Sequence, residues 1–277
     1  MSAAAESWPQ SLVLVGAGKM GEALLRGWLA GGLAPQRATI IDPKPSPAIA
    51  ALAAERGIVL NPPLAGLAPP DVLFLAIKPQ TLEAAAPDLA PLSGAETLVI
   101  SILAGKRIAD LAARLPKARA VARVMPNTPA AVGRGASAGF ASPATSARQR
   151  DWAQSLMRAV GQFDWLDDEA LIDAVTAISG SGPAYVFALV EAMAEAGVKL
   201  GLPAEMAMKL ARATVEGAGE LLHREPEVTA AKLREAVTSP GGTTAAALAV
   251  LRAPDGYPTL LAKAATAARD RARELAG

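Results

Sequence analysis

A glycine-rich turn near the start of the chain constrains the fold more than any other feature. The apolar run Leu12–Val15 leads directly into a G-x-G-x-x-G pattern, and a helix-like stretch, Glu22–Ala30, follows. The first glycine of such a pattern permits a tight turn, the second lets the backbone approach a phosphate, and the third lets helix and sheet pack closely. The pattern therefore predicts a dinucleotide pyrophosphate site at a helix N-terminus, where free N–H groups attract anions. The plainer interpretation is an ordinary corner between a strand and a helix. The pattern comprises Gly16, Ala17, Gly18, Lys19, Met20 and Gly21.

Composition excludes several other functions. The 27 basic and 26 acidic residues nearly balance and no basic run stands out, so nothing indicates nucleic-acid binding. The absence of cysteine excludes disulfides, thiolate metal sites and a cysteine nucleophile. The single histidine, His223, falls late in a predicted helix and is more typical of a surface or capping residue, so we expect no metal site.

The sequence also predicts a protein without membrane or export signals. Residues 1–10 contain an acid and a proline, with no basic region before an apolar stretch, which is not typical of a signal peptide. Glycine, proline or charge interrupts the apolar runs well before about 18 residues, so we expect no membrane span. A cytoplasmic protein is the resulting expectation.

The first half of the chain alternates strand-like and helix-like segments. This alternation predicts βαβ units and an α/β domain with a doubly wound, mostly parallel sheet. Strands are predicted at Leu12–Val15, Ala38–Ile41, Val72–Ile77, Leu98–Leu103, Ala120–Val124, Ala136–Ala141 and Gln162–Trp165. Helices are predicted at Glu22–Ala30, Pro47–Arg56, Thr81–Leu89, Ile108–Leu115 and Ala144–Ala159.

Strand signals stop beyond Asp167, and helical segments take their place. We therefore predict a dinucleotide-binding domain over residues 1–166 and an all-α domain over residues 167–277. Several of these helices are apolar on more than one face, which predicts a large dimer interface. The predicted helices are Glu169–Ile178, Ala184–Leu200, Ala204–His223, Ala230–Val237, Ala245–Arg252 and Pro258–Leu275.

Asp42 ends the second predicted strand, at about the distance from the glycines that a ribose-binding acid requires. A carboxylate there accepts hydrogen bonds from both adenosine ribose hydroxyls and repels the 2′-phosphate of NADP, which favours NADH. Lys19 and Lys44 oppose this preference, because a nearby cation would accept that phosphate. The alternative is a plain turn residue.

Three further loops follow predicted strands, at the sheet edge where doubly wound folds bind ligands. Ala76–Gln80 carries Lys78, which this position predicts to face a ligand. The alternative is a solvated lysine in a loop. Ser101–Gly105 consists largely of small residues, which would let a flat nicotinamide approach the backbone. Arg123–Pro129 is stiffened by two prolines and either borders the nicotinamide or is a structural turn.

Two glycine-containing segments lie in the helical half. Ser179–Tyr185 has small residues that let helices approach closely, and its pattern favours a tight corner between helices over a ligand loop. In Thr238–Thr244 a helix ends, glycines follow and a new helix begins at about Thr244. The exposed N–H groups of Gly242–Thr244, with two threonine hydroxyls, predict a carboxylate pocket. The alternative is a capped helix corner without ligand.

Taken together, these stretches resemble the pyrroline-5-carboxylate reductase family. The resemblance extends over nearly the whole chain, and the Thr238–Thr244 loop with its flanking helices is close to the family's own signature. Ala236 departs from it, since some members place a cofactor-contacting asparagine there. The matching stretches are Gly16–Gly21, Ala76–Pro79, Arg123–Pro129, Asp173–Tyr185 and Leu233–Leu251.

The resemblance implies an N-terminal Rossmann domain and an all-α domain that interlocks into a homodimer, with further assembly into decamers in many members. It implies NADH or NADPH as cofactor and reduction of a cyclic imine to L-proline. Substrate contacts are implied for Glu169, Gly242, Thr243 and Thr244, with Thr244 orienting the imine nitrogen. Cofactor contacts are implied for the Gly16–Gly21 loop and for Asn61, Ala76, Ile77, Lys78, Pro79 and Ala104.

Two other functions remain alternatives at this stage. A β-hydroxyacid dehydrogenase shares the two-domain plan, but it needs a lysine and an asparagine one helical turn apart, and the helix after Gly182 has neither in place. A non-catalytic nucleotide sensor would explain the Gly16–Gly21 loop and leave the Thr238–Thr244 pocket without a role.

Overall fold

The computed structural model describes residues 8–276 and forms two compact units. The first unit runs to Gly180 and includes the chain from Ala268 onward, and the second is Ser181–Ala267. Helix α6 (Ile172–Val175) packs on strands of the sheet, so the units divide later in the chain than residue 166. The functional boundary between residues 166 and 167 stays a prediction.

The first unit is built on an eight-stranded sheet in the order β3-β2-β1-β4-β5-β6-β7-β8. All neighbouring strands are parallel except β6 and β7, which are antiparallel. Residues 126–134, which include the 3₁₀ turn Thr128–Val132, join β6 to β7, and a parallel crossover needs a longer connection. The strands are β1 (Leu12–Val15), β2 (Ala38–Ile41), β3 (Val59–Leu60), β4 (Val72–Leu75), β5 (Leu98–Ser101), β6 (Ala120–Met125), β7 (Gly135–Ala141) and β8 (Gly161–Trp165).

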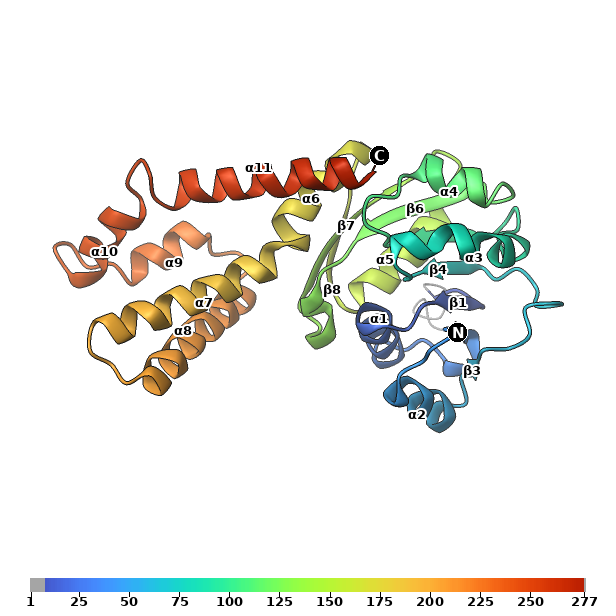
Figure 1. Cartoon of the computed structure of the whole chain (residues 1–277), viewed down its shortest axis with the longest axis horizontal. Helices are drawn as coiled ribbons and strands as arrows, with labels where there is room; N and C mark the ends of the chain where they lie inside the picture. Colours follow the sequence, from blue (N-terminus) through green and yellow to red (C-terminus); the bar gives the residue numbers. More distant parts are fainter. Residues whose placement is uncertain (1–7, 277) are drawn as a thin grey trace. The chain divides into compact units, whose positions relative to one another are not determined.

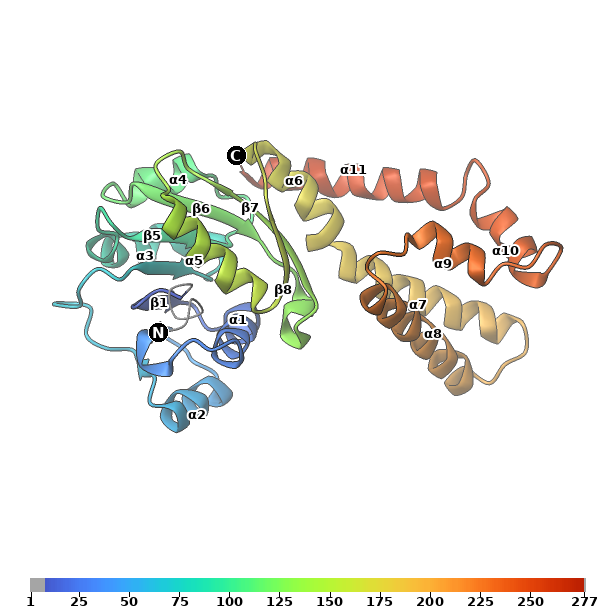
Figure 2. The ribbon, with the colours of Figure 1, turned by 180° about the vertical axis from the view of Figure 1, so that it is seen from behind.

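Helices cover both faces of this sheet, as Figures 1 and 2 show from opposite sides. One face packs on α1 (Lys19–Ala30), α2 (Pro47–Arg56) and α5 (Ala147–Arg158). The other packs on α3 (Leu82–Leu89) and α4 (Ile108–Arg114). Because both faces are covered, β1, β4, β5 and β6 are buried along their whole length. The predicted doubly wound α/β fold is confirmed.

Local differences from the predicted elements have local causes. Helix α1 begins at Lys19 rather than Glu22, because Gly18 is its N-cap and the glycine pattern already contains the first helical turn. Helix α5 begins at Ala147 rather than Ala144, because Ser146 and Gln149 form a capping box. The short strand β3 has only two residues and was not among the ranges that the apolar pattern predicts.

The second unit is helical. It contains α7 (Gly182–Lys199), α8 (Ala204–Arg224), α9 (Ala230–Ala236) and α10 (Thr243–Leu251), and α11 (Tyr257–Ala276) begins there. Helices α7 and α8 lie side by side in both views. The turn between them contains Gly201, whose φ of +97° suits glycine, and Pro203, the N-cap of α8.

The segment at Ser179–Tyr185 differs from the predicted corner. Thr176–Gly180 forms a π-helical turn, and Ser181 keeps right-handed helical dihedral angles (φ −86°, ψ −20°) before α7 begins. The backbone therefore stays helical through this segment, and the prediction of a tight corner is wrong. Short π-helical turns are frequent at functional sites.

The second unit exposes large apolar side chains, including Phe187 at 64% and Leu200 at 86%. Among the described residues, one helical stretch, Glu169–Lys199, is long and apolar enough to cross a membrane by length and composition alone. Glycines and charges interrupt the apolar runs of this stretch, but its average hydropathy stays high. Apolar helix faces of this kind equally suit burial against another protein surface.

Candidate active site

The glycine turn is built as its pattern predicts. Gly16 has φ +89°, and a Cβ there would lie 2.7 Å from the carbonyl oxygen of Ala76. A Cβ on Gly21 would collide with the carbonyl oxygen of Gly16, so the third glycine lets α1 approach the turn. A Cβ on Gly18 would meet nothing within 4 Å, so the backbone is open there. This open backbone at the N-terminus of α1 can receive an anion.

Asp42, just after β2, is tied to this turn. Its Oδ2 accepts a hydrogen bond from the N–H of Ala17 at 2.7 Å, and its Oδ1 accepts one from the N–H of Lys44 at 2.8 Å. The N–H of Gly16 donates to the carbonyl oxygen of Ile41 at 2.8 Å. The carboxylate is therefore fixed beside the glycine turn, as a ribose-binding acid must be.

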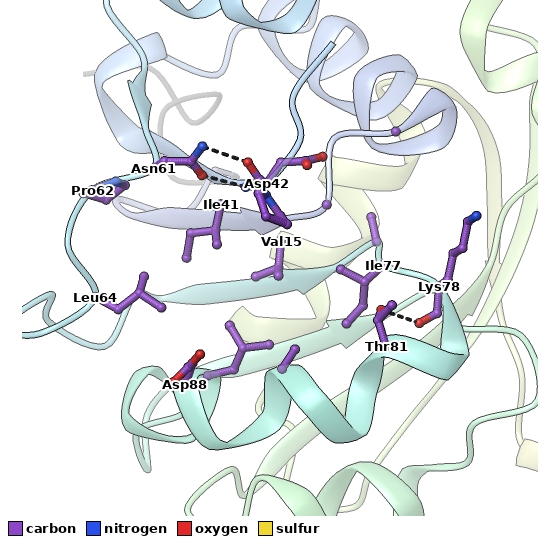
Figure 3. A pocket seen from close by; sticks show the side chains of 16 residues that line it. Val15, Ile41, Asp42, Asn61, Pro62, Leu64, Ile77, Lys78, Thr81 and Asp88 are labelled. Carbon is purple, nitrogen blue, oxygen red and sulfur yellow. Dashed lines mark hydrogen bonds between the residues drawn. The ribbon is translucent and has the colours of Figure 1, made fainter.

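A cavity of about 550 Å³ opens at this edge of the sheet (Figure 3). It brings together residues from the ends of β1, β2, β3 and β4 and from one side of α3. Seven of the predicted cofactor residues line it: Gly16, Gly18, Asp42, Asn61, Ala76, Ile77 and Lys78.

The other predicted cofactor residues do not line the cavity. Ala17 is buried and its N–H binds Asp42, while Gly21 packs against Gly16. In the first turn of α1, Lys19 is exposed and Met20 is half-buried. Pro79 begins the 3₁₀ turn Pro79–Thr81, and Ala104 is exposed in the loop after β5.

Part of the cavity wall was not predicted from the sequence. Pro62 and Leu64 in the loop after β3, and Ala85 and Leu89 on α3, also line the cavity. The two α3 residues are spaced so that they share one face of a helix, and this spacing could have predicted them. The loop after β3 has no regular pattern that could have predicted Pro62 and Leu64. Val15, Ile41, Pro43, Thr81 and Asp88 complete the lining.

Asn127, in the loop after β6, links two other segments of the first unit through its side-chain amide. Its Nδ2 donates to the carbonyl oxygen of Ser179 at 3.0 Å, and its Oδ1 accepts from the N–H of Ala136 at 2.9 Å. The side chain is buried and both ends of its amide are used. This favours the structural interpretation of the Arg123–Pro129 loop at this residue.

Glu169 lies in the first unit, beside a buried arginine. Its Oε1 accepts a hydrogen bond from the N–H of Ile108 at 2.8 Å and pairs with Arg123 Nη1 at 3.3 Å. Asp173 lies 3.7 Å from the other side of the same guanidinium. Arg123 is only 3% exposed, and Arg273 Nε lies 3.8 Å from Asp173 Oδ2, so two arginines and two acids balance in this cluster. Glu169 is thus committed to this cluster.

The loop before α10 lies in the second unit. Gly241 has φ +70°, and the N–H of Gly242 donates to the carbonyl oxygen of Ser239 at 3.0 Å, which closes the turn. Gly242 is the N-cap, and the N–H groups of Thr243 and Thr244 fall in the first turn of α10. Helix geometry gives first-turn N–H groups no partner within the helix, so they can receive an anion.

Both parts of the chain match models of known protein families. Residues 169–275 match the family model described as pyrroline-5-carboxylate reductase dimerisation, and residues 11–105 match the model described as NADP oxidoreductase, coenzyme F420-dependent. The pyrroline-5-carboxylate reductase of Pseudomonas aeruginosa is 44% identical over 266 residues, which cover 96% of each chain.

The chain belongs to the pyrroline-5-carboxylate reductase family. It is therefore an oxidoreductase, and the dehydrogenase and nucleotide-sensor alternatives fall away. The family enzyme of Haemophilus influenzae is 38% identical over 243 residues, covering 87% of this chain and 89% of the relative.

Solved structures of the family have the same fold. The Coxiella burnetii enzyme, 36% identical, superposes with a TM-score of 0.88 over 97% of this chain and 99% of that one. The Plasmodium falciparum enzyme, solved with NADP bound, is 26% identical and has a TM-score of 0.79 over 96% of this chain and 98% of that one. The Rossmann-like domain followed by a helical dimerisation domain is thereby confirmed.

Proposed function

We propose that this chain reduces pyrroline-5-carboxylate to L-proline with NADH or NADPH. The observation that carries the proposal is the 44% identity to a pyrroline-5-carboxylate reductase over 96% of the chain. The cavity at the sheet edge supports it, because its glycine turn, acid and volume suit a dinucleotide.

The first unit would hold the cofactor. The N–H groups at the start of α1 would bind the pyrophosphate, Asp42 the adenosine ribose, and the apolar wall of Leu64 and Leu89 the adenine. A reduced nicotinamide bound at this site would supply hydride to the carbon of the C=N bond. Ala104, on the edge after β5, would border the ring.

The loop before α10 would hold the substrate. The N–H groups of Thr243 and Thr244 would bind the carboxylate, since the N–H of Gly242 already bonds within the turn. The Thr244 hydroxyl would orient the imine nitrogen, which is an amine in the product. A protonated imine is already electrophilic, so the protein mainly aligns two reactants and excludes water. Glu169, the remaining predicted substrate residue, would also face the substrate.

We also propose a cytoplasmic homodimer formed through the helical domain, residues 167–277, with decamers of five dimers as a further assembly. The dimerisation model matched at residues 169–275 and the exposed apolar side chains of α7 support the dimer. On this proposal a second copy, and not lipid, covers the apolar stretch Glu169–Lys199. The absence of cysteine fits a reducing compartment.

The decisive experiment measures the absorbance of NADH over time in a mixture with the purified protein. Steady oxidation of NADH on adding pyrroline-5-carboxylate, with L-proline formed in equal amount, is the expected result. The same rates measured with NADPH rank the two cofactors. A protein that binds NADH and forms no proline would refute the proposed reaction.

A further inference from the structure

Asn61 adopts an unusual backbone conformation beside the cofactor cavity. Among residues 8–276 it is the one non-glycine residue with positive φ, at +53°. Glycine takes this region without steric cost, and asparagine is one of the few other residues that visit it. The conformation alone would therefore favour glycine, and the asparagine side chain needs a reason of its own.

The side-chain amide of Asn61 supplies that reason, because it clamps the backbone of Asp42. The N–H of Asp42 donates to Asn61 Oδ1 at 2.8 Å, and Asn61 Nδ2 donates to the carbonyl oxygen of Asp42 at 2.7 Å (Figure 3). The main chain is joined as well, since the N–H of Asn61 donates to the carbonyl oxygen of Ile40 at 2.8 Å. The side-chain amide thus extends the contact between these two segments past Ile41, the last residue of β2.

This clamp holds the residue whose charge faces the cavity. Both oxygens of the Asp42 carboxylate accept backbone N–H groups, from Ala17 and Lys44. With its peptide groups held by Asn61 and its carboxylate held by these two donors, Asp42 has little freedom to turn away. A negative charge is therefore fixed on the cavity wall beside the glycine turn.

We propose that Asn61 is a positioning residue that sets the preference between NADH and NADPH by holding Asp42 in place. This rests on the proposed cofactor site. A fixed carboxylate binds the two hydroxyls of an unmodified ribose and repels a 2′-phosphate. Without the Asn61 amide, the backbone of Asp42 can shift and draw its carboxylate away from the N–H groups of Ala17 and Lys44, so both the attraction and the repulsion weaken. Asn61 acts on the preference through Asp42.

The test is calorimetric titration of the full-length protein with NADH and with NADPH, without imine. The quantity compared is the ratio of the Kd for NADPH to the Kd for NADH. Asn61→Gly removes the amide and keeps the backbone conformation accessible, and it should lower this ratio about three- to tenfold. Asp42→Ser, which removes the charge, should lower the ratio further.

The double variant identifies the route of the effect. If Asn61 acts through Asp42, adding Asn61→Gly to Asp42→Ser leaves the ratio of the single Asp42→Ser variant unchanged. Val59→Ala is the matched control, because this exposed residue of β3 lies near the clamp without contributing to it. It should leave the wild-type ratio unchanged.

Two results would overturn the inference. One is an unchanged ratio in Asn61→Gly, and the other is an equal fold-change from Asn61→Gly with and without Asp42. Wild-type protein that binds neither dinucleotide would instead refute the proposed cofactor site. Wild-type binding with a null result at Asn61 refutes the positioning role alone.

Discussion

Single glycines of the turn differ in the substitutions that they tolerate, in line with the separate roles that the sequence pattern predicts for them. Gly16 is enclosed by the backbone of Ala76, whereas Gly18 faces open space. The first glycine is required by the protein's own packing, and the second by the approach of a ligand. Substitution at the two positions therefore separates folding from binding.

Gly16→Ala should lower both stability and NADH affinity, because the new Cβ would lie 2.7 Å from a backbone oxygen at a φ of +89°. Gly18→Ala is the matched control and should weaken NADH binding while the thermal midpoint stays within about 2 °C, since a surface change costs less than about 0.5 kcal/mol. Thermal melts and NADH titrations of both variants check this. Equal thermal midpoints for the two variants would contradict it.

Thr244→Ala should lower kcat about tenfold and leave the Kd for NADH within about twofold, since one hydrogen bond contributes about 0.5–1.5 kcal/mol. The reason is that Thr244 lies in the second unit, on the proposed substrate loop, whereas the cofactor cavity is in the first unit. Steady-state rates and NADH titration measure the two quantities. An equal loss of both would mean that Thr244 has a structural role.

At the scale of elements, the loop after β6 and the π-helical turn are joined by one side chain. Asn127 bonds the carbonyl oxygen of Ser179 in that turn and the N–H of Ala136 in β7. A π-helical turn displaces backbone groups from the regular helix pattern, and a side-chain amide can satisfy them. The two elements therefore stabilise each other.

Asn127→Ala should lower the free energy of unfolding by about 1–3 kcal/mol, because it removes two hydrogen bonds that contribute about 0.5–1.5 kcal/mol each. Thr128→Ala, at the exposed neighbouring position, is the control and should change it by less than about 0.5 kcal/mol. Urea denaturation at a fixed protein concentration measures both. Equal free energies of unfolding for the two variants would show that the Asn127 hydrogen bonds do not stabilise the fold.

At the scale of the whole molecule, the helical unit exposes more apolar surface than an isolated unit would tolerate. Phe187 on α7 is 64% exposed, and Leu210 on α8 is 51% exposed. Burial of such surface between copies contributes about 25 cal/mol per Å² of apolar area. The family's dimerisation domain accounts for this surface, so stability should depend on association.

Phe187→Glu should shift the protein toward monomers, because a charge would enter the apolar interface. Val132→Glu is the control, since Val132 is 73% exposed and lies in the first unit. Light scattering after size-exclusion chromatography measures the mass of each variant. An unchanged mass for the Phe187 variant would place the dimer contact elsewhere.

The sequence by itself determined the features that depend on neighbours along the chain. The glycine turn, the alternation of strands with helices and the loop before α10 were all predicted, because turns, periodicity and caps are local. The ends of β1, β2 and α2 matched to the residue. Similarity to the reductase family rested on the same local motifs.

Only the tertiary structure decided what depends on residues far apart in sequence. The bond from Ala17 to Asp42 spans 25 residues, and the Glu169 to Arg123 pair spans 46. The π-helical turn, the clamp of Asn61 on Asp42 and the commitment of Glu169 to a buried arginine likewise need the assembled sheet. Tertiary packing determines which distant groups form hydrogen bonds. The periodicity of the sequence indicates only helices and strands, so it does not predict these partners.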